Sequence, residues 1–120
     1  QINDFECMLA ETGTTILKFY LHITKDEQKK RLEERRDTPE KQWKFQPGDL
    51  PVREQWDDYM EAYEDALSAT STKHAPWHVI PANSKLARNL MVSALLIEAL
   101  EGMKMHYPDP APGITDAEIV

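Results

Sequence analysis

Apolar residues recur along the chain at two different spacings, which predict helices and strands in alternation. Residues 2–11 carry apolar side chains at helical spacing, and Gly13 follows at a position that commonly ends a helix. Residues 15–23 (TILKFYLHI) are almost wholly apolar and rich in β-branched and aromatic side chains. This composition predicts a strand that is buried on both faces, as in a parallel sheet. His22 would then be a core residue rather than a metal ligand.

A polar helix is predicted after this strand. Thr24 and Glu27 have the T-x-x-E spacing of a capping box, and the helix should run to about Arg36. The segment 37–39 would end it, because a residue that precedes proline disfavours the helical conformation. With Leu32 as the one leucine in its middle, this helix is better suited to lie over a site than to pack in a core.

A loop over residues 40–50 and a long helix are predicted next. Asp49 would cap the helix, and Pro51 is tolerated in its first turn. One face carries an apolar stripe at helical spacing, formed by Val52, Trp56, Tyr59, Tyr63 and Leu67. Residues 54–66 hold six acidic residues and no basic one. We interpret these as an exposed face, and the alternative is that they neutralise the basic residues that precede them.

A second strand is predicted over residues 77–82 (WHVIPA), followed by a last helix that Asn83 or Ser84 caps. This helix has a clear apolar face, formed by Leu86, Leu90, Ala94, Ile97 and Leu100. Basic residues lie in its first turn, where the helix dipole disfavours them unless an anion docks there.

His74 and His78 are four residues apart, a spacing that suits a metal pair only on a helix. Pro76 lies between them and argues against a helix there, so we predict no metal site. The tail, residues 107–120, has three prolines within five positions and is predicted to be disordered or extended.

The order of these elements predicts an α/β fold in which two strands lie parallel, with helices between them. A sheet normally needs three or more strands to be stable. The chain therefore either pairs with a second copy or forms part of a larger fold, and we favour the larger fold.

Length and composition narrow the class of protein. At 120 residues the chain is one domain or a piece of one, and no apolar run approaches the ~18 residues of a membrane span. The first residues, QINDFECML, show no signal peptide, and the single cysteine, Cys7, excludes an internal disulfide. We therefore expect a cytoplasmic protein. Its net charge of −7 argues against a nucleic acid as the main partner.

The basic residues are concentrated in one stretch, residues 25–53, which holds nine of the 14. One explanation is a polyanionic ligand that several cations hold together. The other is a solvated helix face on which basic residues pair with their own Glu and Asp neighbours. Trp43 and Phe45 alternate here with Lys41 and Lys44, an arrangement that can stack a base or anchor the loop to the body.

Four sequence runs resemble the type-2 polyphosphate kinase family. They are R-L-x-x-R from position 31, P-x-K-x-W-K-F from 39, G-D-L-x-x-R-x-x-W-D-D-Y-M-E-A-Y-E-D-A-L from 48 and A-P-W-H-V-I-P-A from 75. The resemblance covers residues 2–103 and is to the carboxyl-terminal half of such enzymes. It implies a P-loop kinase fold in which residues 1–106 form half of one domain, with a lid at about 25–70.

The resemblance also implies phosphoryl transfer between inorganic polyphosphate and a nucleotide, with Mg²⁺ as cofactor. The expected nucleotides are AMP/ADP or ADP/ATP, with guanine nucleotides as a further option, and a homo-oligomer is expected. Carried over to this chain, it assigns phosphate binding to Arg31, Arg35, Lys41, Lys44, Arg53 and Arg88. Phosphoryl transfer needs positioning and charge neutralisation, which such side chains supply.

This assignment predicts how the removal of two arginines affects activity and stability. We expect that replacing Arg31 and Arg35 together would weaken the use of polyphosphate severely. The fold should change little in stability, because exposed charges contribute ~0–1 kcal/mol each.

The sequence departs from the family at the catalytic loop. A P-loop reads G-x-x-x-x-G-K-[ST], and none of the four glycines here precedes a lysine. Neither predicted strand ends in the aspartate that would hold magnesium, so the magnesium ligands are expected outside this chain. We therefore expect no catalytic residue in the chain and no activity from it alone. The alternative is a non-catalytic polyanion-binding or assembly module.

Overall fold

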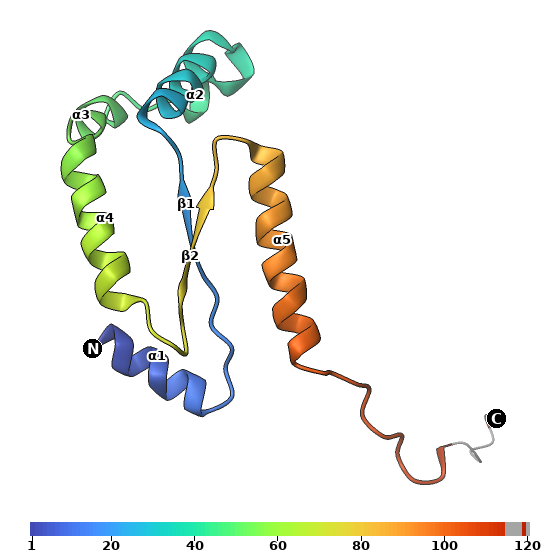
Figure 1. Cartoon of the computed structure of the whole chain (residues 1–120). Coiled ribbons are helices and arrows are strands. Elements are labelled where there is room, and N and C mark those ends of the chain that lie inside the picture. The colour runs from blue at the N-terminus through green and yellow to red at the C-terminus, as the bar shows by residue number, and fades with distance from the viewer. Residues whose placement is uncertain (115–118, 120) are drawn as a thin grey trace.

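The chain forms a two-stranded parallel sheet with helices on both sides and a helical hairpin at one end (Figure 1). The computed structural model describes residues 1–114 and 119. Its elements are α1 (Ile2–Glu11), β1 (Lys18–His22), α2 (Lys25–Asp37), the 3-10 helix η1 (Pro39–Lys44), α3 (Asp49–Glu54), α4 (Trp56–Thr70), β2 (Trp77–Pro81) and α5 (Lys85–Gly102). The α/β class and the parallel pairing predicted from the sequence are confirmed.

The two strands pair along their whole length, and α4 and α5 lie on opposite sides of the pair (Figure 1). On one side the ring of Tyr20 packs against Tyr63 of α4, with the ring centroids 4.9 Å apart. On the other side α5 runs back along β2, whose Ile80 is buried. This arrangement places the carboxyl ends of both strands at the end of the sheet where α2 and α5 begin.

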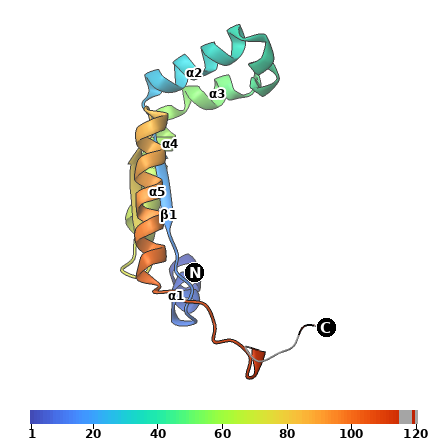
Figure 2. The same ribbon diagram turned by 90° about the vertical axis from the view of Figure 1, so that its right-hand side faces the viewer.

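Helices α2 and α3 lie side by side and project beyond the sheet, with η1 at the far end (Figure 2). We call residues 25–54 the hairpin and η1 its tip. Arg53 of α3 closes the base of the hairpin. Its guanidinium donates to the carbonyl oxygen of Lys25, at 2.8 Å, and to Oε1 of Gln28, at 2.7 Å.

Local sequence signals explain where α1, α2 and α5 begin or end. Thr24 Oγ1 accepts the Glu27 N–H at 3.2 Å, and Ser84 Oγ accepts the Ala87 N–H at 3.3 Å. Each hydroxyl satisfies an amide in the first helical turn that has no partner inside the helix. Gly13 follows α1 with a φ of 91°, a left-handed conformation that costs glycine no steric energy. These predictions are confirmed.

Two predictions between α2 and α4 are wrong. The predicted loop over residues 40–50 contains η1, because Pro39 already has the φ that a first helical turn requires. The predicted single helix from Asp49 is two helices, and Asp49 makes no side-chain cap. Gln55 interrupts it, with φ −87° and ψ 24°. The break lets α3 follow α2 while α4 turns to follow the sheet (Figure 2).

Burial within the described residues is sparse. The buried apolar side chains are Leu32, Ala75, Ile80 and Ala82. The radius of gyration is 21.8 Å, whereas a compact chain of this length would have about 14 Å. The chain is therefore an open arrangement of elements around a small sheet.

Several surfaces predicted to be buried are exposed. The strand predicted over residues 15–23 is regular only over β1, where Leu21 is 48% exposed and His22 is also exposed. The prediction of a core histidine is therefore wrong for this chain. On α5 the predicted apolar face is open to solvent, with Leu86 81% and Leu90 69% exposed. These apolar faces need a further layer of protein, as a two-stranded sheet requires.

Beyond α5 the chain has little regular structure. Residues 105–111 belong to no helix or strand, and a short turn follows at 112–114. The prediction of a disordered or extended tail also concerns residues 115–118 and 120, which lie outside the described residues. Within residues 1–114 and 119, no helix combines the length and the apolar character needed to cross a membrane.

The sparse burial predicts how this chain unfolds. Because few side chains are removed from water, we expect the isolated 120 residues to show a weak, broad transition in differential scanning calorimetry. The dye ANS should bind the exposed apolar faces of α1 and α5 before any heating. A sharp two-state transition without ANS binding would contradict this expectation.

Candidate functional site

The candidate site lies at the carboxyl ends of the strands, where β1 leads into α2 and β2 leads into α5. Ala82 N–H donates to the carbonyl oxygen of His22 at 2.7 Å, which extends the sheet by one bond. The side chain of Asn83 then bridges to Thr24: Oδ1 accepts the Thr24 N–H at 3.0 Å, and Nδ2 donates to Thr24 Oγ1 at 3.2 Å. Open parallel sheets commonly bind ligands at this end.

Arg31 is anchored at this site. Its Nε donates to Glu27 Oε1 at 2.7 Å, and one Nη donates to the carbonyl oxygens of Ala82, at 2.8 Å, and Asn83, at 3.1 Å. Its side chain is 20% exposed. The expectation that Arg31 is an exposed charge of little structural value is therefore wrong, because it joins α2 to the turn before α5.

Arg35 lies one helical turn further along α2. It is half-buried, and within the described part of the chain it makes no ion pair or side-chain hydrogen bond. An arginine carries five N–H donors in a planar fork that fits phosphate oxygens in pairs. The guanidinium donors of Arg35 are therefore not engaged by any side chain of the described residues.

Arg53 also keeps its charge, although it is hydrogen-bonded. Both of its acceptors, the Lys25 carbonyl and the Gln28 amide, are neutral. The contact between Arg53 and Gln28 has no local signal in the sequence, because the two residues are 25 positions apart. Arg53 thus stabilises the base of the hairpin while leaving a positive charge there.

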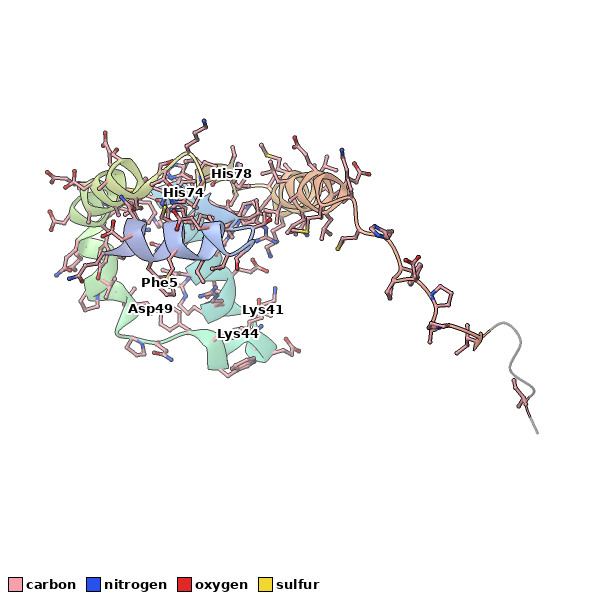
Figure 3. The ribbon with its side chains drawn as sticks, turned by 90° about the horizontal axis from the view of Figure 1, so that it is seen from below. Phe5, Lys41, Lys44, Asp49, His74 and His78 are labelled. Atoms are coloured by element: carbon pink, nitrogen blue, oxygen red, sulfur yellow. The ribbon has the colours of Figure 1, made fainter. Side chains whose placement is uncertain are left out.

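At the tip, Lys41 and Lys44 lie together on η1 (Figure 3). Lys41 pairs with Glu34 of α2. Lys44 Nζ lies over the Trp43 ring, 4.9 Å from its centroid, and Trp43 is 77% exposed. This exposure argues against the alternative that Trp43 anchors the loop to the body.

The start of α5 adds two cations to the site. Arg88 donates to Oδ1 of its neighbour Asn89, at 2.8 and 3.1 Å. Lys85 is the first residue of the same helix. Lys41 is the main cause of the lowered pKa of Glu34, through a hydrogen bond and its charge, and Lys85 and Lys30 lower it further.

Intramolecular ion pairs neutralise part of the basic stretch. Four of its nine basic residues pair with carboxylates of the same stretch: Lys29, Arg31, Arg36 and Lys41. The other five have no carboxylate within ion-pair distance among residues 1–114 and 119: Lys25, Lys30, Arg35, Lys44 and Arg53. The interpretation of a self-neutralised solvated face therefore explains only part of the stretch.

The acidic face of α4 does not contribute to this neutralisation. None of its carboxylates forms an ion pair in the described residues, and all of them are exposed. This supports their interpretation as an exposed face rather than as counter-charges to the hairpin.

The described residues offer no metal centre, since no three His, Cys, Asp or Glu side chains cluster in the manner of ligands. His78 lies on β2 beside Phe19, and both His74 and His78 are distant from the hairpin tip (Figure 3). Burial and the neighbouring Glu11 carboxylate raise the pKa of the Cys7 thiol, which disfavours a nucleophilic thiolate.

Comparison with known proteins adds independent findings. The sequence model of the family described as Polyphosphate kinase 2 (PPK2) matches residues 1–108. An AMP/ADP-polyphosphate phosphotransferase of Meiothermus ruber is 62% identical over 91% of this chain and 41% of its own length. An ADP-polyphosphate phosphotransferase of Rhodopseudomonas palustris is 49% identical over 92% of this chain and 38% of its own.

A solved structure agrees with these relatives. The crystal structure of polyphosphate kinase 2 from Arthrobacter aurescens TC1 matches with a TM-score of 0.92 and 51% identity, over 96% of this chain and 41% of that chain. The chain spans about two fifths of the length of these three proteins.

The contact between Glu34 and Lys41 predicts a pH dependence at the tip. The Glu34 pKa is lowered, so the stabilisation from Lys41 is present above the ordinary glutamate value of about 4.3 and is lost as the pH falls through the lowered value. In a carboxyl-carbon NMR titration, Lys41→Met should raise the pKa of Glu34, and Lys44→Met should leave it unchanged. Equal titration in both variants would show that the ion pair does not form.

Proposed function

The chain belongs to the polyphosphate kinase 2 family, and from this premise we propose that it is part of an enzyme that transfers phosphoryl groups. The donor and acceptor are inorganic polyphosphate and a nucleoside mono- or diphosphate. One structural observation supports the proposal in addition to the family. The hairpin projects from the carboxyl ends of the strands with five basic residues that no carboxylate of the described chain neutralises.

The hairpin is proposed to act as a lid over the phosphates. Polyphosphate is a linear chain of negative charges, and several separated cations bind it better than one concentrated site. Arg53 lies at the base of the hairpin, Arg35 in the last turn of α2 and Lys44 at the tip, so charge is present at both ends of the hairpin. Lys41 and Arg88 add cations that phosphate can recruit from weak exposed contacts.

Trp43 and Lys44 give the tip a second capability. An exposed indole with an ammonium over its face can stack a nucleobase or close onto another surface of the enzyme. When the lid closes, it excludes water from the phosphates, which strengthens the attraction of the cations.

Catalysis is proposed to need residues outside this chain. The 120 residues contain no G-x-x-x-x-G-K run, and no three His, Cys, Asp or Glu side chains cluster within the described residues. A P-loop and carboxylate ligands for Mg²⁺ would complete the site at the same end of the sheet. They would come with further strands, which the open edge of the two-stranded sheet can pair.

The acceptor is proposed from the relatives. The Meiothermus ruber protein is named for AMP and ADP, and the Rhodopseudomonas palustris protein for ADP. Because the first of these is more similar to this chain, we propose that AMP and ADP are both accepted. ATP in the reverse direction, guanine nucleotides and a homo-oligomer remain parts of the proposal, as does a cytoplasmic location.

A phosphoryl-transfer assay distinguishes this proposal from the alternative, a non-catalytic polyanion-binding or assembly module. A phosphoryl-transfer assay with polyphosphate, Mg²⁺ and AMP or ADP should give no product with the 120 residues alone. A longer chain that carries a P-loop upstream should give product. Product from the 120 residues alone would contradict the account of the missing catalytic loop, and none from the longer chain would favour the binding module.

The free donors of Arg35 predict a specific effect. In the full-length protein, Arg35→Gln should raise the KM for polyphosphate about tenfold or more, because a charged hydrogen bond to phosphate is lost. The matched control is Lys73→Gln, an exposed cation outside the hairpin, which should leave this KM unchanged. Equal KM values for both variants would remove Arg35 from the proposed binding surface.

A further inference from the structure

Asn83 occupies the joint between the two strand–helix units. Its amide oxygen accepts the N–H of Thr24, and its amide nitrogen donates to the Thr24 hydroxyl. That hydroxyl in turn caps α2 by accepting the Glu27 N–H. One side chain from the start of α5 therefore fixes both the backbone and the cap at the start of the hairpin.

Arg31 completes the same joint from the side of α2. Three of its five N–H donors are already used, one by Glu27 and two by the carbonyl oxygens of Ala82 and Asn83. A phosphate that recruited these donors would have to displace both carbonyls and would leave them unpaired. Glu27 also neutralises much of the charge that would attract the phosphate.

We propose that Asn83 and Arg31 form a latch that sets the angle of the hairpin relative to α5. The latch fixes the spacing between Arg35, carried on α2, and Arg88, carried on α5. Asn83 and Arg31 are then positioning residues, and the gripping of polyphosphate falls to cations with free donors. The inference rests on the proposed function, since the latch matters only if the two helices bind one substrate.

The latch consists of two separate sets of hydrogen bonds. Arg31 of α2 binds the two carbonyls that follow β2, while the amide of Asn83 binds Thr24, the residue that caps α2. Losing either partner leaves the other half of the joint in place, so the fold should persist while the hairpin gains freedom. A looser hairpin would still collect polyphosphate but would align it less often for transfer.

The test uses the full-length protein with polyphosphate and ADP. Asn83→Ala should lower kcat about tenfold at a temperature far below Tm, with a much smaller change in the KM for polyphosphate. Asn83→Asp, which keeps the acceptor for the Thr24 N–H but loses the donor, should give an intermediate loss. Gln46→Ala is the matched control, because it removes an exposed amide of the hairpin that makes no side-chain hydrogen bond in the described residues.

A second readout separates positioning from binding. The dependence of log KM on log salt concentration reports how many phosphates are contacted, as for other linear polyanions. Arg31→Lys should leave this slope unchanged, and Arg35→Gln should reduce it by about one. If Arg31→Lys reduces the slope as much as Arg35→Gln does, Arg31 is a phosphate ligand and the proposal is wrong.

A third readout needs no activity. Spin labels at Glu40→Cys and Glu98→Cys, with the other cysteines removed, measure the distance between the hairpin tip and α5. This distance should be narrowly distributed in the parent protein and broad in Asn83→Ala. Unchanged distributions with an unchanged kcat would refute the latch. A parent protein without phosphoryl transfer would instead refute the proposed function, whatever the distances show.

Discussion

The structure depends on a small set of hydrogen bonds at the carboxyl ends of β1 and β2. There the N–H of Ala82 continues the sheet, the amide of Asn83 bridges to Thr24, and Arg31 binds the carbonyls of the following turn. The bonds from Arg31 to Glu27 and Ala82 are partly buried, whereas those between Asn83 and Thr24 are exposed. The joint decides how a projecting basic hairpin is held against the start of α5.

The second constraint is the burial of apolar side chains, for which this chain has too few strands and helices. A two-stranded sheet cannot bury both of its own faces and those of the helices around it. Leu86 and Leu90 of α5 and Phe5 of α1 are accordingly more than half exposed. Membership of the polyphosphate kinase 2 family explains this, because the chain matches only about two fifths of the length of its relatives.

Local signals in the sequence predicted the element order and several helix ends. The hydroxyls of Thr24 and Ser84 each cap a helix by accepting the N–H three residues further on. The alternation of apolar strand and helix segments predicts the parallel sheet. The break at Gln55 was missed because no proline or glycine marks it. The latch was also missed, because Arg31 and Asn83 are 52 positions apart and only the fold brings them together. The exposure of His22 could not be predicted from the sequence either. An apolar strand is buried only where other parts of a protein pack against it, and the strand's own sequence does not show whether they do.

The central claim is that unneutralised cations of the hairpin hold polyphosphate. Lysine acetylation of the full-length protein, read by mass spectrometry with and without polyphosphate, tests it most directly. The account predicts protection of Lys30 and Lys44, with unchanged reactivity at Lys73 and Lys104, which are exposed outside the hairpin. Equal protection at all four lysines, or none at Lys30 and Lys44, would contradict it and would reduce the basic stretch to a solvated surface.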